Sequence, residues 1–477
     1  MYLGIDVGTG GVRCAVYTLG GQCVATGSSA LRDAEVPNLP LGRHEQQPDA
    51  WWRALCNCLR SMKGKARLGD VVALSVDSTS GTVLFLDGAG RPLRPALMYN
   101  DSRSIEQSRR VNAAAGDFIA RHGYRFNASF GLSKILWVKE KEPNVFAKTV
   151  RICHPADYVA GRIRGDVSFT DTSNALKTGC DLFDGTWPEF ISKDLGIPAE
   201  KLLRLVAPGT PTGTVCRGAS RDLGLSEKTV VVAGCTDGTA GFLASGAAGE
   251  GRWASVLGTT LVLRGISKSI VKDPAGRIYC HRHPDGWWLP GAACTVGGEC
   301  LMVHFPNRDL AALDRLALES PLTDLIYYPL VRRGERFPFV NPTAEGFMTR
   351  KPESEVELHM ACLEGVAFVE RWAMDVFGSL GADVSGPVFT TGGGARSGLW
   401  LSVRASVLGR ELHVPEHSGC EFGAAALAAA PDCGSVSEAC QRVVRIRHTI
   451  GPDPAIRKHY DDKYAEFRRE CARRGYQ

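Results

Sequence analysis

MYLGIDVGTGGVRCAVYT, residues 1–18, opens this chain and says more about its fold than any other stretch. Residues 2–5 and 12–17 are apolar runs with the alternation and β-branched content of strands. The glycine-rich residues 8–11 between them predict a sharp turn, and Asp6 lies where the first strand ends. A loop of bare amides with a carboxylate at its mouth suits a phosphate and its divalent metal. An ordinary hairpin with a solvated Asp6 is the alternative.

The composition limits the class of protein. A chain of 477 residues is too long for one average domain, so two domains are expected. A hydrophobic fraction of 44% and a charged fraction of 22% are typical of a globular protein. The net charge of +5 is mild and the basic residues are dispersed, so no nucleic-acid partner is expected. Without an 18-residue apolar run or a basic-then-apolar leader, the prediction is a cytoplasmic protein with no membrane partner.

The sixteen cysteines are scattered through the chain without a C-x-x-C pair. In a long chain of this kind they are expected to be reduced and mostly buried. Cys280, His281 and His283 resemble a metal-binding cluster at first sight. Because no second ligand pair follows at a suitable spacing, a strand end with polar side chains is favoured over a zinc site.

The first half of the chain predicts an α/β domain. A third strand over residues 23–28, a helix over 48–63 and strands over 71–76 and 83–86 follow the opening hairpin. This order indicates a mixed sheet rather than repeated βαβ units. An NAD-dependent dehydrogenase is excluded, because no G-x-G-x-x-G follows the first strand in a βαβ unit.

The second half starts in a similar way. Predicted strands over residues 253–257 and 261–264 flank Gly258, Thr259 and Thr260, which repeats the strand, Gly-Thr turn and strand of the N-terminus. Such self-similarity suggests two related lobes, with a boundary in the small residues near 244–251.

A third glycine cluster favours a bound nucleotide. A predicted strand over residues 387–391, the triplet 392–394 and a helix over 399–408 would point backbone N–H groups at a ligand. One glycine triplet is weak evidence, but three such loops in one chain are much stronger.

Asp237 is the best candidate for a general base. It follows a buried-type strand over residues 230–233 and precedes a helix of small residues. Phosphoryl transfer needs phosphate-cradling loops, a divalent metal and a group that accepts the hydroxyl proton. A helix N-cap is an equally common task for Asp, and the sequence leaves both interpretations open.

Residues 77–82, Asp-Ser-Thr-Ser-Gly-Thr, are rich in hydroxyl and carboxylate groups. This density suits a polyhydroxylated ligand, and a polar turn is the alternative. Residues 99–103 form a second polar cluster, in which Arg103 is expected to anchor a loop rather than touch a ligand.

Four of these motifs together resemble the FGGY carbohydrate kinases. They are Gly-Ile-Asp-Val-Gly-Thr at 4–9, Cys-Thr-Asp-Gly-Thr-Ala at 235–240, Gly-Glu-Arg-Phe-Pro at 334–338 and Gly-Gly-Gly-Ala-Arg-Ser at 392–397. The resemblance runs in order from residue 1 to about 430. It implies an α/β fold of two actin-like (ribonuclease H-like) lobes, whose mixed sheets are flanked by helices and whose cleft closes on a sugar and Mg-ATP. The implied lobes are residues 1–245, which bind the sugar, and 246–477, which bind the nucleotide.

The resemblance also implies roles for individual residues. Asp237 is the catalytic base and contacts the substrate, Ser80 binds the sugar, and Asp6 contacts the substrate. Asp6 and Asp237 hold Mg²⁺. Many relatives have Asn where this chain has Ser397 in the adenine loop. The implied ATP-binding residues are Gly8, Thr9, Gly10, Gly11, Gly258, Thr259, Thr260, Gly393, Gly394 and Ser397.

Within the family, the sugar-side motif discriminates between substrates. Xylulose kinases typically carry Met-His-Gly-Gln where this chain has residues 77–82, which resemble a D-ribulose kinase-like branch found in cyanobacteria and plants. Residues 174–177 and 327–330 agree with that branch. The implied activity is phosphorylation of the terminal hydroxyl of a pentulose, D-ribulose to D-ribulose 5-phosphate. The alternatives are D-xylulose or another ketose or polyol, and a non-catalytic actin-like nucleotide switch.

The C-terminal residues 458–474 predict a charged helix with Tyr460, Tyr464 and Phe467 on one face. An apolar face of this kind is expected to pack on a lobe rather than to bind a partner. The sequence leaves the oligomeric state open.

Overall fold

The computed structural model describes residues 1–320 and 322–477, which divide into two compact units. The first unit is Met1–Ala244 with His281–Gly286 and His417–Arg445. The second is Ser245–Cys280, Trp287–Glu416 and Ile446–Gln477. The first break follows Ala244, within the expected boundary near 244–251. The two later segments in the first unit differ from the expected simple division at residue 245.

The first unit is built on a mixed six-stranded sheet with the order β11-β12-β5-β1-β2-β3. The three N-terminal strands are antiparallel, as the sequence predicts, whereas β1, β5 and β12 run parallel. The strands are β1 (Tyr2–Val7), β2 (Gly11–Tyr17), β3 (Cys23–Ala30), β5 (Ala73–Ser78), β11 (Pro211–Thr214) and β12 (Val230–Thr236).

Both faces of β1 are buried by helices. All six residues of the strand are buried, and Leu3 and Ile5 share an apolar core with Trp51 of α1 (Pro48–Ser61), the helix predicted over 48–63. Gly4 points to the other face, because side chains alternate along a strand. There a Cβ would lie 1.8 Å from the carbonyl oxygen of Glu421 in α15 (Cys420–Cys433). Glycine is therefore required where α15 meets the strand.

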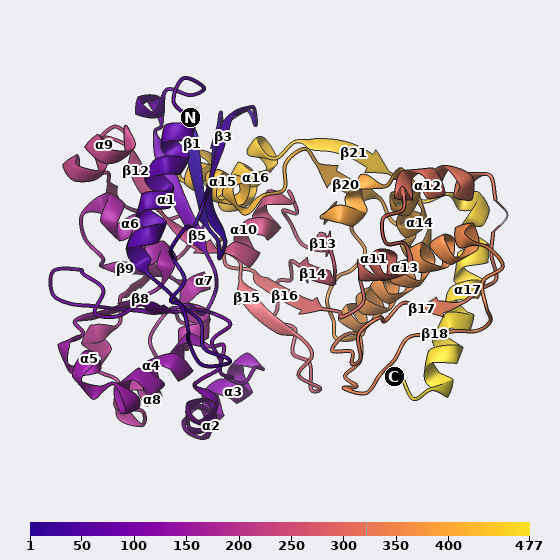
Figure 1. The fold of residues 1–477 in the computed structure, drawn as a ribbon, viewed down its shortest axis with the longest axis horizontal. Helices are drawn as coiled ribbons and strands as arrows, with labels where there is room; N and C mark the ends of the chain where they lie inside the picture. The colour runs from indigo at the N-terminus through magenta and orange to yellow at the C-terminus, as the bar shows by residue number, and fades with distance from the viewer. Residues whose placement is uncertain (321) are drawn as a thin grey trace. The chain divides into compact units, whose positions relative to one another are not determined.

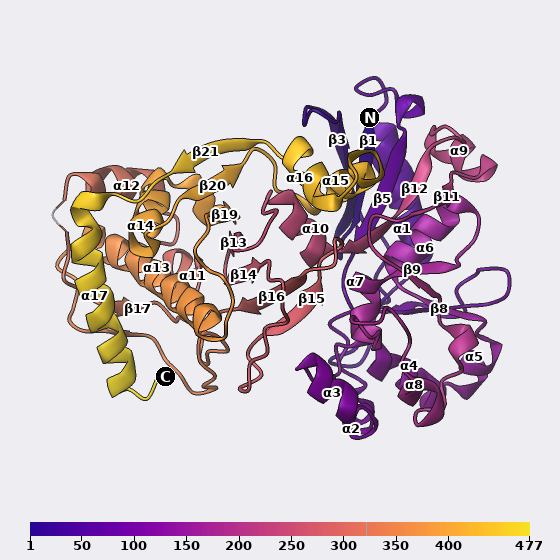
Figure 2. The same ribbon diagram turned by 180° about the vertical axis from the view of Figure 1, so that it is seen from behind.

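This contact explains why a late segment belongs to the first unit. The gold α15 lies beside the indigo β1 in both views (Figure 1, Figure 2). It also packs on α10 (Asp237–Ala244), where a Cβ on Gly423 would meet the carbonyl oxygen of Ala240 at 1.8 Å. Such close approach depends on glycines that lie more than 400 residues apart in the chain.

Smaller elements complete the first unit. The segment predicted as a strand over 83–86 is β6, which pairs with β8 outside the main sheet. The remaining helices are α2 (Ile105–Ala114), α3 (Gly116–His122), α4 (Gly131–Lys141), α5 (Pro143–Lys148), α6 (Pro155–Arg164), α7 (Thr172–Ala175), α8 (Glu189–Lys193), α9 (Arg217–Leu223) and α16 (Val436–Val443), with 3-10 turns η1 (Leu68–Asp70), η2 (Leu176–Thr178) and η3 (Ala199–Lys201). The short strands are β4 (Glu45–Gln46), β6 (Leu84–Leu86), β7 (Ala96–Leu97), β8 (Arg151–Cys153), β9 (Phe169–Asp171) and β10 (Arg204–Val206).

A seven-stranded sheet with the order β15-β16-β14-β13-β19-β20-β21 belongs to the second unit, except for the last two residues of β15. Its strands are β13 (Trp253–Leu257), β14 (Leu261–Gly265), β15 (Tyr279–Arg282), β16 (Trp288–Ala293), β19 (Val388–Thr391), β20 (Leu412–Pro415) and β21 (Ile446–Ile450). A separate antiparallel pair is formed by β17 (Tyr327–Tyr328) and β18 (Phe347–Met348). The helices of the second unit are α11 (Glu299–His304), α12 (Leu310–Leu318), α13 (Glu355–Ser379), α14 (Gly398–Leu408) and α17 (Pro454–Arg473), with the 3-10 turn η4 (Gly393–Arg396).

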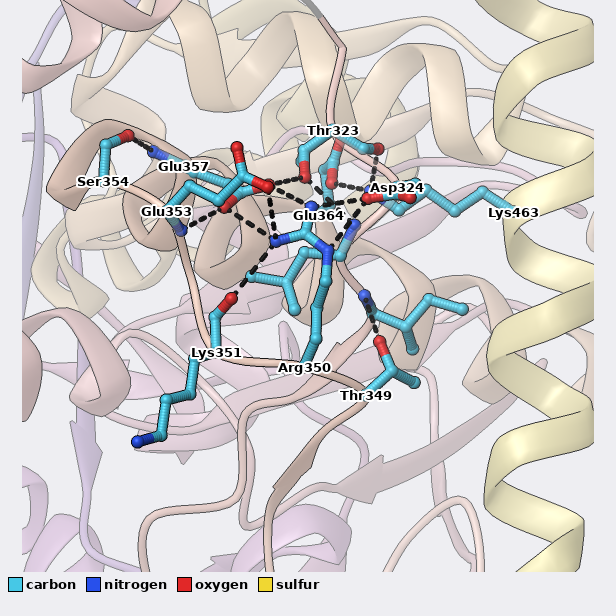
Figure 3. Close-up of polar contacts among 12 residues, drawn as sticks. Thr323, Asp324, Thr349, Arg350, Lys351, Glu353, Ser354, Glu357, Glu364 and Lys463 are labelled. Carbon is cyan, nitrogen blue, oxygen red and sulfur yellow. Dashed lines mark hydrogen bonds and ion pairs between the residues drawn. The ribbon is translucent and has the colours of Figure 1, made fainter.

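The C-terminal helix packs as the sequence predicts. Tyr460, Tyr464 and Phe467 of α17 are buried, and the ring of Phe467 lies 5.3 Å from that of Phe368 in α13. A polar network reinforces this contact (Figure 3): Lys463 donates to the Glu364 carboxylate of α13 and to the carbonyl oxygen of Thr323. None of the helices in residues 1–320 and 322–477 is both long enough and apolar enough to span a bilayer.

Candidate active site

Three carboxylates of the first unit gather at one edge of its sheet. In the parallel pair of β1 and β5, Asp6 lies directly opposite Asp77. On the other side of β5, Cys235 of β12 is the partner of Asp77, and Asp237 begins α10 two residues later. Because these strands are parallel, their carboxyl ends meet at the same edge, which is where open α/β sheets bind ligands.

A bulge in β12 shapes this arrangement. The register with β5 shifts between Val232 and Cys235. Within the bulge, a Cβ on Gly234 would lie 1.7 Å from the carbonyl oxygen of Val76, so only glycine fits there. Both strands also run further than the sequence predicts: β5 ends at Ser78 rather than residue 76, and β12 at Thr236 rather than residue 233. Asp77 is therefore a strand residue and not part of a turn.

The charges of Asp6 and Asp77 are poorly compensated. Burial raises the pKa of Asp6 to about 6, and the neighbouring Asp77 carboxyl opposes this shift. Burial and the charge of Asp6 raise the pKa of Asp77 well above its usual range. Neither carboxyl oxygen of Asp77 has another hydrogen-bond partner. One proton shared by two facing carboxyls satisfies both observations, with Asp77 as the group that keeps it.

Two further charged groups border this pair. Glu421, at the start of α15, is 8% exposed, and its Oε2 atom is buried without a hydrogen-bond partner. Its negative charge raises the pKa values of Asp6 and Asp77. Arg13 of β2 approaches Asp6 at 3.4 Å, but its side chain is largely exposed, so it compensates little of the negative charge.

A tight turn follows β1 at residues 8–11, as the sequence predicts. The Gly8 N–H donates to the carbonyl oxygen of Gly11 at 3.0 Å, which closes the turn. The side-chain amide of Gln46 donates to the carbonyl oxygen of Thr9, and the Trp51 indole N–H donates to Gln46 in turn. Gly10 is exposed, with open space where a Cβ would be. The turn is thus fixed from α1 while its tip stays accessible.

Hydroxyl groups on both sides position Asp237. The Ser173 hydroxyl of α7 accepts the Thr236 N–H and bonds the hydroxyls of Thr236 and Thr239 at 3.1 and 3.0 Å. All three hydroxyl residues are buried, whereas Asp237 is half-buried. One Asp237 oxygen accepts the following Gly238 N–H at 2.6 Å. The backbone of Asp237 is therefore held at both flanks.

The segment expected to bind sugar leaves Ser80 available. Thr79 and Thr82 bond each other at 2.9 Å, and the Thr82 hydroxyl also accepts the Tyr99 N–H. Ser80 Oγ is buried and has no hydrogen-bond partner, although Lys177 donates to the Ser80 carbonyl oxygen. The contacts of the threonines are those of a turn, while Ser80 keeps an unused hydroxyl.

Arg103 anchors a loop, as expected. Its guanidinium donates twice to Asp101, at 2.8 and 2.7 Å, and lies 2.7 Å from Glu45. These contacts link residues 99–103 to the short strand β4. They also pair the positive charge of Arg103 with two carboxylates.

The remaining ATP-binding candidates lie in the second unit. Gly258 donates to the carbonyl oxygen of Thr260, and no heavy atom lies within 4 Å of a Cβ placed on Gly258 or Gly393. A Cβ on Gly394 would meet the Leu257 side chain at 2.4 Å, so this glycine serves packing as well. The strand, glycine loop and helix predicted around residues 387–408 are β19, η4 and α14.

Ser397 has structural contacts of its own. Its hydroxyl accepts the Trp400 N–H as the N-cap of α14 and donates to Asp314 at 2.7 Å. A contact of Ser397 with adenine stays a prediction.

None of the sixteen cysteines forms a disulfide, and thirteen of them are buried, as the sequence predicts. Cys280 donates to the carbonyl oxygen of Val271, and His283 accepts the Asp285 N–H. In the part of the chain that the structure describes, no three His, Cys, Asp or Glu side chains are grouped as metal ligands.

Sequence reasoning missed Asp77 and Glu421 as members of the carboxylate group. The sequence predicts that the strand ends at residue 76, one residue before Asp77. Only the pairing of β5 with β1 shows that the strand continues to Ser78. Glu421 has no local signal, because its place beside Asp6 comes from the contact of α15 with Gly4.

Comparison with known proteins identifies the class. The N-terminal domain of the FGGY family of carbohydrate kinases matches residues 1–244, and its C-terminal domain matches residues 271–431. The xylulose kinase of Escherichia coli is 29% identical over 100% of this chain and 99% of its own length. That of Streptomyces coelicolor is 32% identical over 90% of this chain and 87% of its own length.

Solved structures agree with the sequence matches. The crystal structure of xylulose kinase from Rhodospirillum rubrum superimposes with a TM-score of 0.86 at 27% identity, covering 99% of this chain and 98% of that one. This chain belongs to the FGGY family of carbohydrate kinases and has the two-lobed, actin-like α/β fold expected from its sequence.

Proposed function

We propose that this kinase transfers the γ-phosphate of ATP to the terminal hydroxyl of a pentulose, with D-ribulose as the preferred sugar. The observation that carries the proposal is the meeting of Asp6, Asp77 and Asp237 at one strand edge, with unsatisfied oxygens among them. Buried polar groups without partners are rare in folded proteins and are typical of functional sites.

Asp237 acts as the general base in this mechanism. Its carboxylate accepts the proton of the sugar's terminal hydroxyl while that oxygen attacks the γ-phosphorus and the bond to the β-phosphate oxygen breaks. The products are the sugar phosphate and ADP, and the proton passes from Asp237 to solvent. The hydroxyls of Ser173, Thr236 and Thr239 keep the base in place, so little reorganisation is needed.

The sugar is held from the segment around Ser80. A ketose hydroxyl supplies the partner that the buried Ser80 Oγ lacks. The turns at residues 8–11 of the first unit and 258–260 of the second bind phosphate oxygens through backbone N–H groups other than those of Gly8 and Gly258, which close the turns. Gly393, Gly394 and Ser397 contact the adenosine.

Magnesium fits the carboxylate edge. Mg²⁺ prefers oxygen ligands and binds through one or two carboxylates together with water and phosphate oxygens. Asp6 and Asp237 would hold it, and the unpartnered oxygens of Asp77 and Glu421 are of the right chemistry beside them. When bound, the ion supplies positive charge to the phosphate oxygens.

D-xylulose is the second candidate substrate, supported by the xylulose kinases among the relatives. Against it stands the segment 77–82, which lacks the Met-His-Gly-Gln typical of xylulose kinases. Sixteen thiols without a disulfide support a reducing compartment, and we place the protein in the cytoplasm.

Kinetics on a panel of sugars test the proposal. The purified chain is assayed for ADP release with Mg-ATP and D-ribulose, D-xylulose, L-ribulose, gluconate or glycerol. The expected result is a kcat/KM for D-ribulose that exceeds every other by at least about tenfold, or about 1.4 kcal/mol of discrimination. A preference for D-xylulose or glycerol would overturn the substrate assignment. ADP release that ignores every sugar would instead indicate a nucleotide switch.

A further inference from the structure

Lys134 of α4 is a fully buried lysine in the first unit. Its ammonium donates to three backbone carbonyl oxygens, those of Gly81 and Ser129 at 2.9 Å and that of Tyr99 at 3.3 Å. These acceptors come from three separate loops, so a single side chain links them. A buried lysine that bonds only backbone carbonyls is unusual, because burying a charge without a partner of opposite charge is costly.

The charged groups around Lys134 do not neutralise it. Asp101 favours its protonated form, while Lys177 and Arg103 oppose it. Asp101 is itself bound twice by Arg103, so its negative charge is already paired. Burial lowers the pKa of Lys134 to about 7; the charge of Asp101 opposes this shift, and the charges of Lys177 and Arg103 add to it.

The three loops surround the segment expected to bind sugar. Gly81 follows Ser80 directly and has φ of +90°, and a Cβ there would meet the Ser129 carbonyl oxygen at 2.5 Å. The Tyr99 loop is tied to the same segment by the bond of its N–H with Thr82. Without Lys134, three carbonyl oxygens would converge on one point with no donor between them. Their mutual repulsion would move the backbone on the C-terminal side of Ser80.

We propose that Lys134 is a positioning residue for the sugar: its ammonium holds the loops of Gly81, Tyr99 and Ser129 together, and so fixes Ser80 where the pentulose binds. This inference rests on the proposed function, in which Ser80 contacts the sugar. The protonated side chain supplies three donors for three acceptors, whereas the neutral amine supplies two. Deprotonation therefore leaves one buried carbonyl without a partner and weakens sugar binding, while the nucleotide loops keep their contacts.

Kinetics of Lys134→Met test the role, with Lys139→Met as the matched control. Lys139 lies on the same helix and donates to the Leu195 carbonyl oxygen, far in sequence from residues 79–82. We expect the KM for the best pentulose to rise about tenfold or more in Lys134→Met, with the KM for ATP changed less than about twofold. Lys139→Met should keep both KM values. Equal sugar KM values in a folded Lys134→Met and the wild type would overturn the inference.

The pH dependence of the wild-type sugar KM provides a second test, which does not require Lys134→Met to fold. With Mg-ATP saturating, the sugar KM of the wild type should rise several-fold between pH 6.5 and 8.5, as Lys134 loses its proton. Lys134→Gln, which carries an uncharged amide donor, should show a sugar KM independent of pH over this range. A flat wild-type profile would contradict the role of the ammonium.

The two proposals fail in different ways. If no pentulose is phosphorylated by the wild type, the proposed function fails. If the wild type is active on a pentulose but its sugar KM responds to neither Lys134 substitution nor pH, only the inference about Lys134 fails.

Discussion

Each of the two units buries ionisable side chains at its sheet. In the second unit a buried pair carries opposite charges, whereas in the first unit two buried carboxyls face each other. In the second unit, Arg404 and Glu370 are both fully buried and form a bidentate ion pair. The guanidinium group of Arg404 also donates to the hydroxyls of Ser255 and Thr390. In the first unit, the acidic side chains of Asp6 and Asp77 face each other, and the carboxyl oxygens of Asp77 have no hydrogen-bond partner. Compensated charges stabilise a fold, whereas uncompensated ones are available for a ligand.

The strands that precede the two glycine turns also differ in whether they carry an acidic side chain. Asp6 lies two residues before Gly8 in β1, and Val256 lies two residues before Gly258 in β13. The backbone pattern is shared, yet Asp6 is buried and Val256 is 38% exposed. The second hairpin can offer amides to a phosphate but no carboxylate. Of these two hairpins, only the one in the first unit carries a carboxylate before its glycine turn.

Asp237→Ala should have the largest effect. Removing a general base lowers kcat by roughly 10²–10⁴-fold, and the sugar-dependent release of ADP should fall by about 10³-fold. ATP affinity, measured by titration calorimetry, should stay nearly intact, because the proposed nucleotide contacts are made by the backbone of the glycine turns. Asp222→Ala, on the partly exposed Asp222 of α9, is the control and should be fully active. Full activity in Asp237→Ala would remove the proposed mechanism.

Arg404→Met should be the most destabilising change. It leaves the Glu370 carboxylate buried without its cation, which costs about 3–5 kcal/mol. For a unit of this size, the melting temperature should fall by about 10 °C in thermal unfolding followed by circular dichroism.

The double variant Arg404→Met/Glu370→Leu sharpens this result. Replacing a buried ion pair by apolar side chains of similar volume is often nearly neutral, so most of the lost stability should return. A double variant as unstable as Arg404→Met would mean that packing, and not charge compensation, holds this region together.

Asp77→Asn should stabilise the first unit. Between the pKa of an unfolded Asp and the raised pKa of Asp77, the folded state keeps a proton that the unfolded state loses, so folding stability falls as pH rises through that range. Asn removes this penalty and can still donate to Asp6. At pH 7.5 we expect a gain of a few degrees in melting temperature, or roughly 1–2 kcal/mol. At pH 4 the gain should nearly vanish, and an equal gain at both pH values would contradict the assignment of the proton to Asp77.

Local motifs predicted much of this molecule, and long-range contacts account for the rest. The hairpin with Asp6, the strand before Asp237 and the glycine loops follow from short patterns of apolar and glycine residues. Glu421 could not be found this way, because the helix that carries it reaches Gly4 from more than 400 residues along the chain. The sequence predicts a strand that ends at residue 76, just before Asp77, because the parallel pairing that extends β5 to Ser78 is not visible in one strand's sequence.

The hydrogen bonds of Ser173 are another long-range contact that the sequence does not predict, over a shorter separation along the chain. Its hydroxyl is 63 and 66 residues from the two threonines that it bonds, and no pattern in the sequence joins them. Since these threonines flank Asp237, Ser173→Ala should act on the position of the base. The loss of about 1 kcal/mol of hydrogen bonding predicts a fall in kcat of about fivefold, with the KM values for sugar and ATP nearly unchanged.

Ser192→Ala is the matched control for this last change. The Ser192 hydroxyl donates to the Glu189 carbonyl oxygen within α8, so its loss removes one hydroxyl–backbone bond far from Asp237 along the chain. It should leave kcat at the wild-type value. A Ser173→Thr variant restores a hydroxyl and should recover part of the lost rate, because the acceptor for the Thr236 N–H returns. If Ser173→Ala kept the wild-type kcat, the hydroxyl cluster would be a packing feature of the first unit, and the uncompensated carboxylates alone would distinguish its chemistry from that of the second.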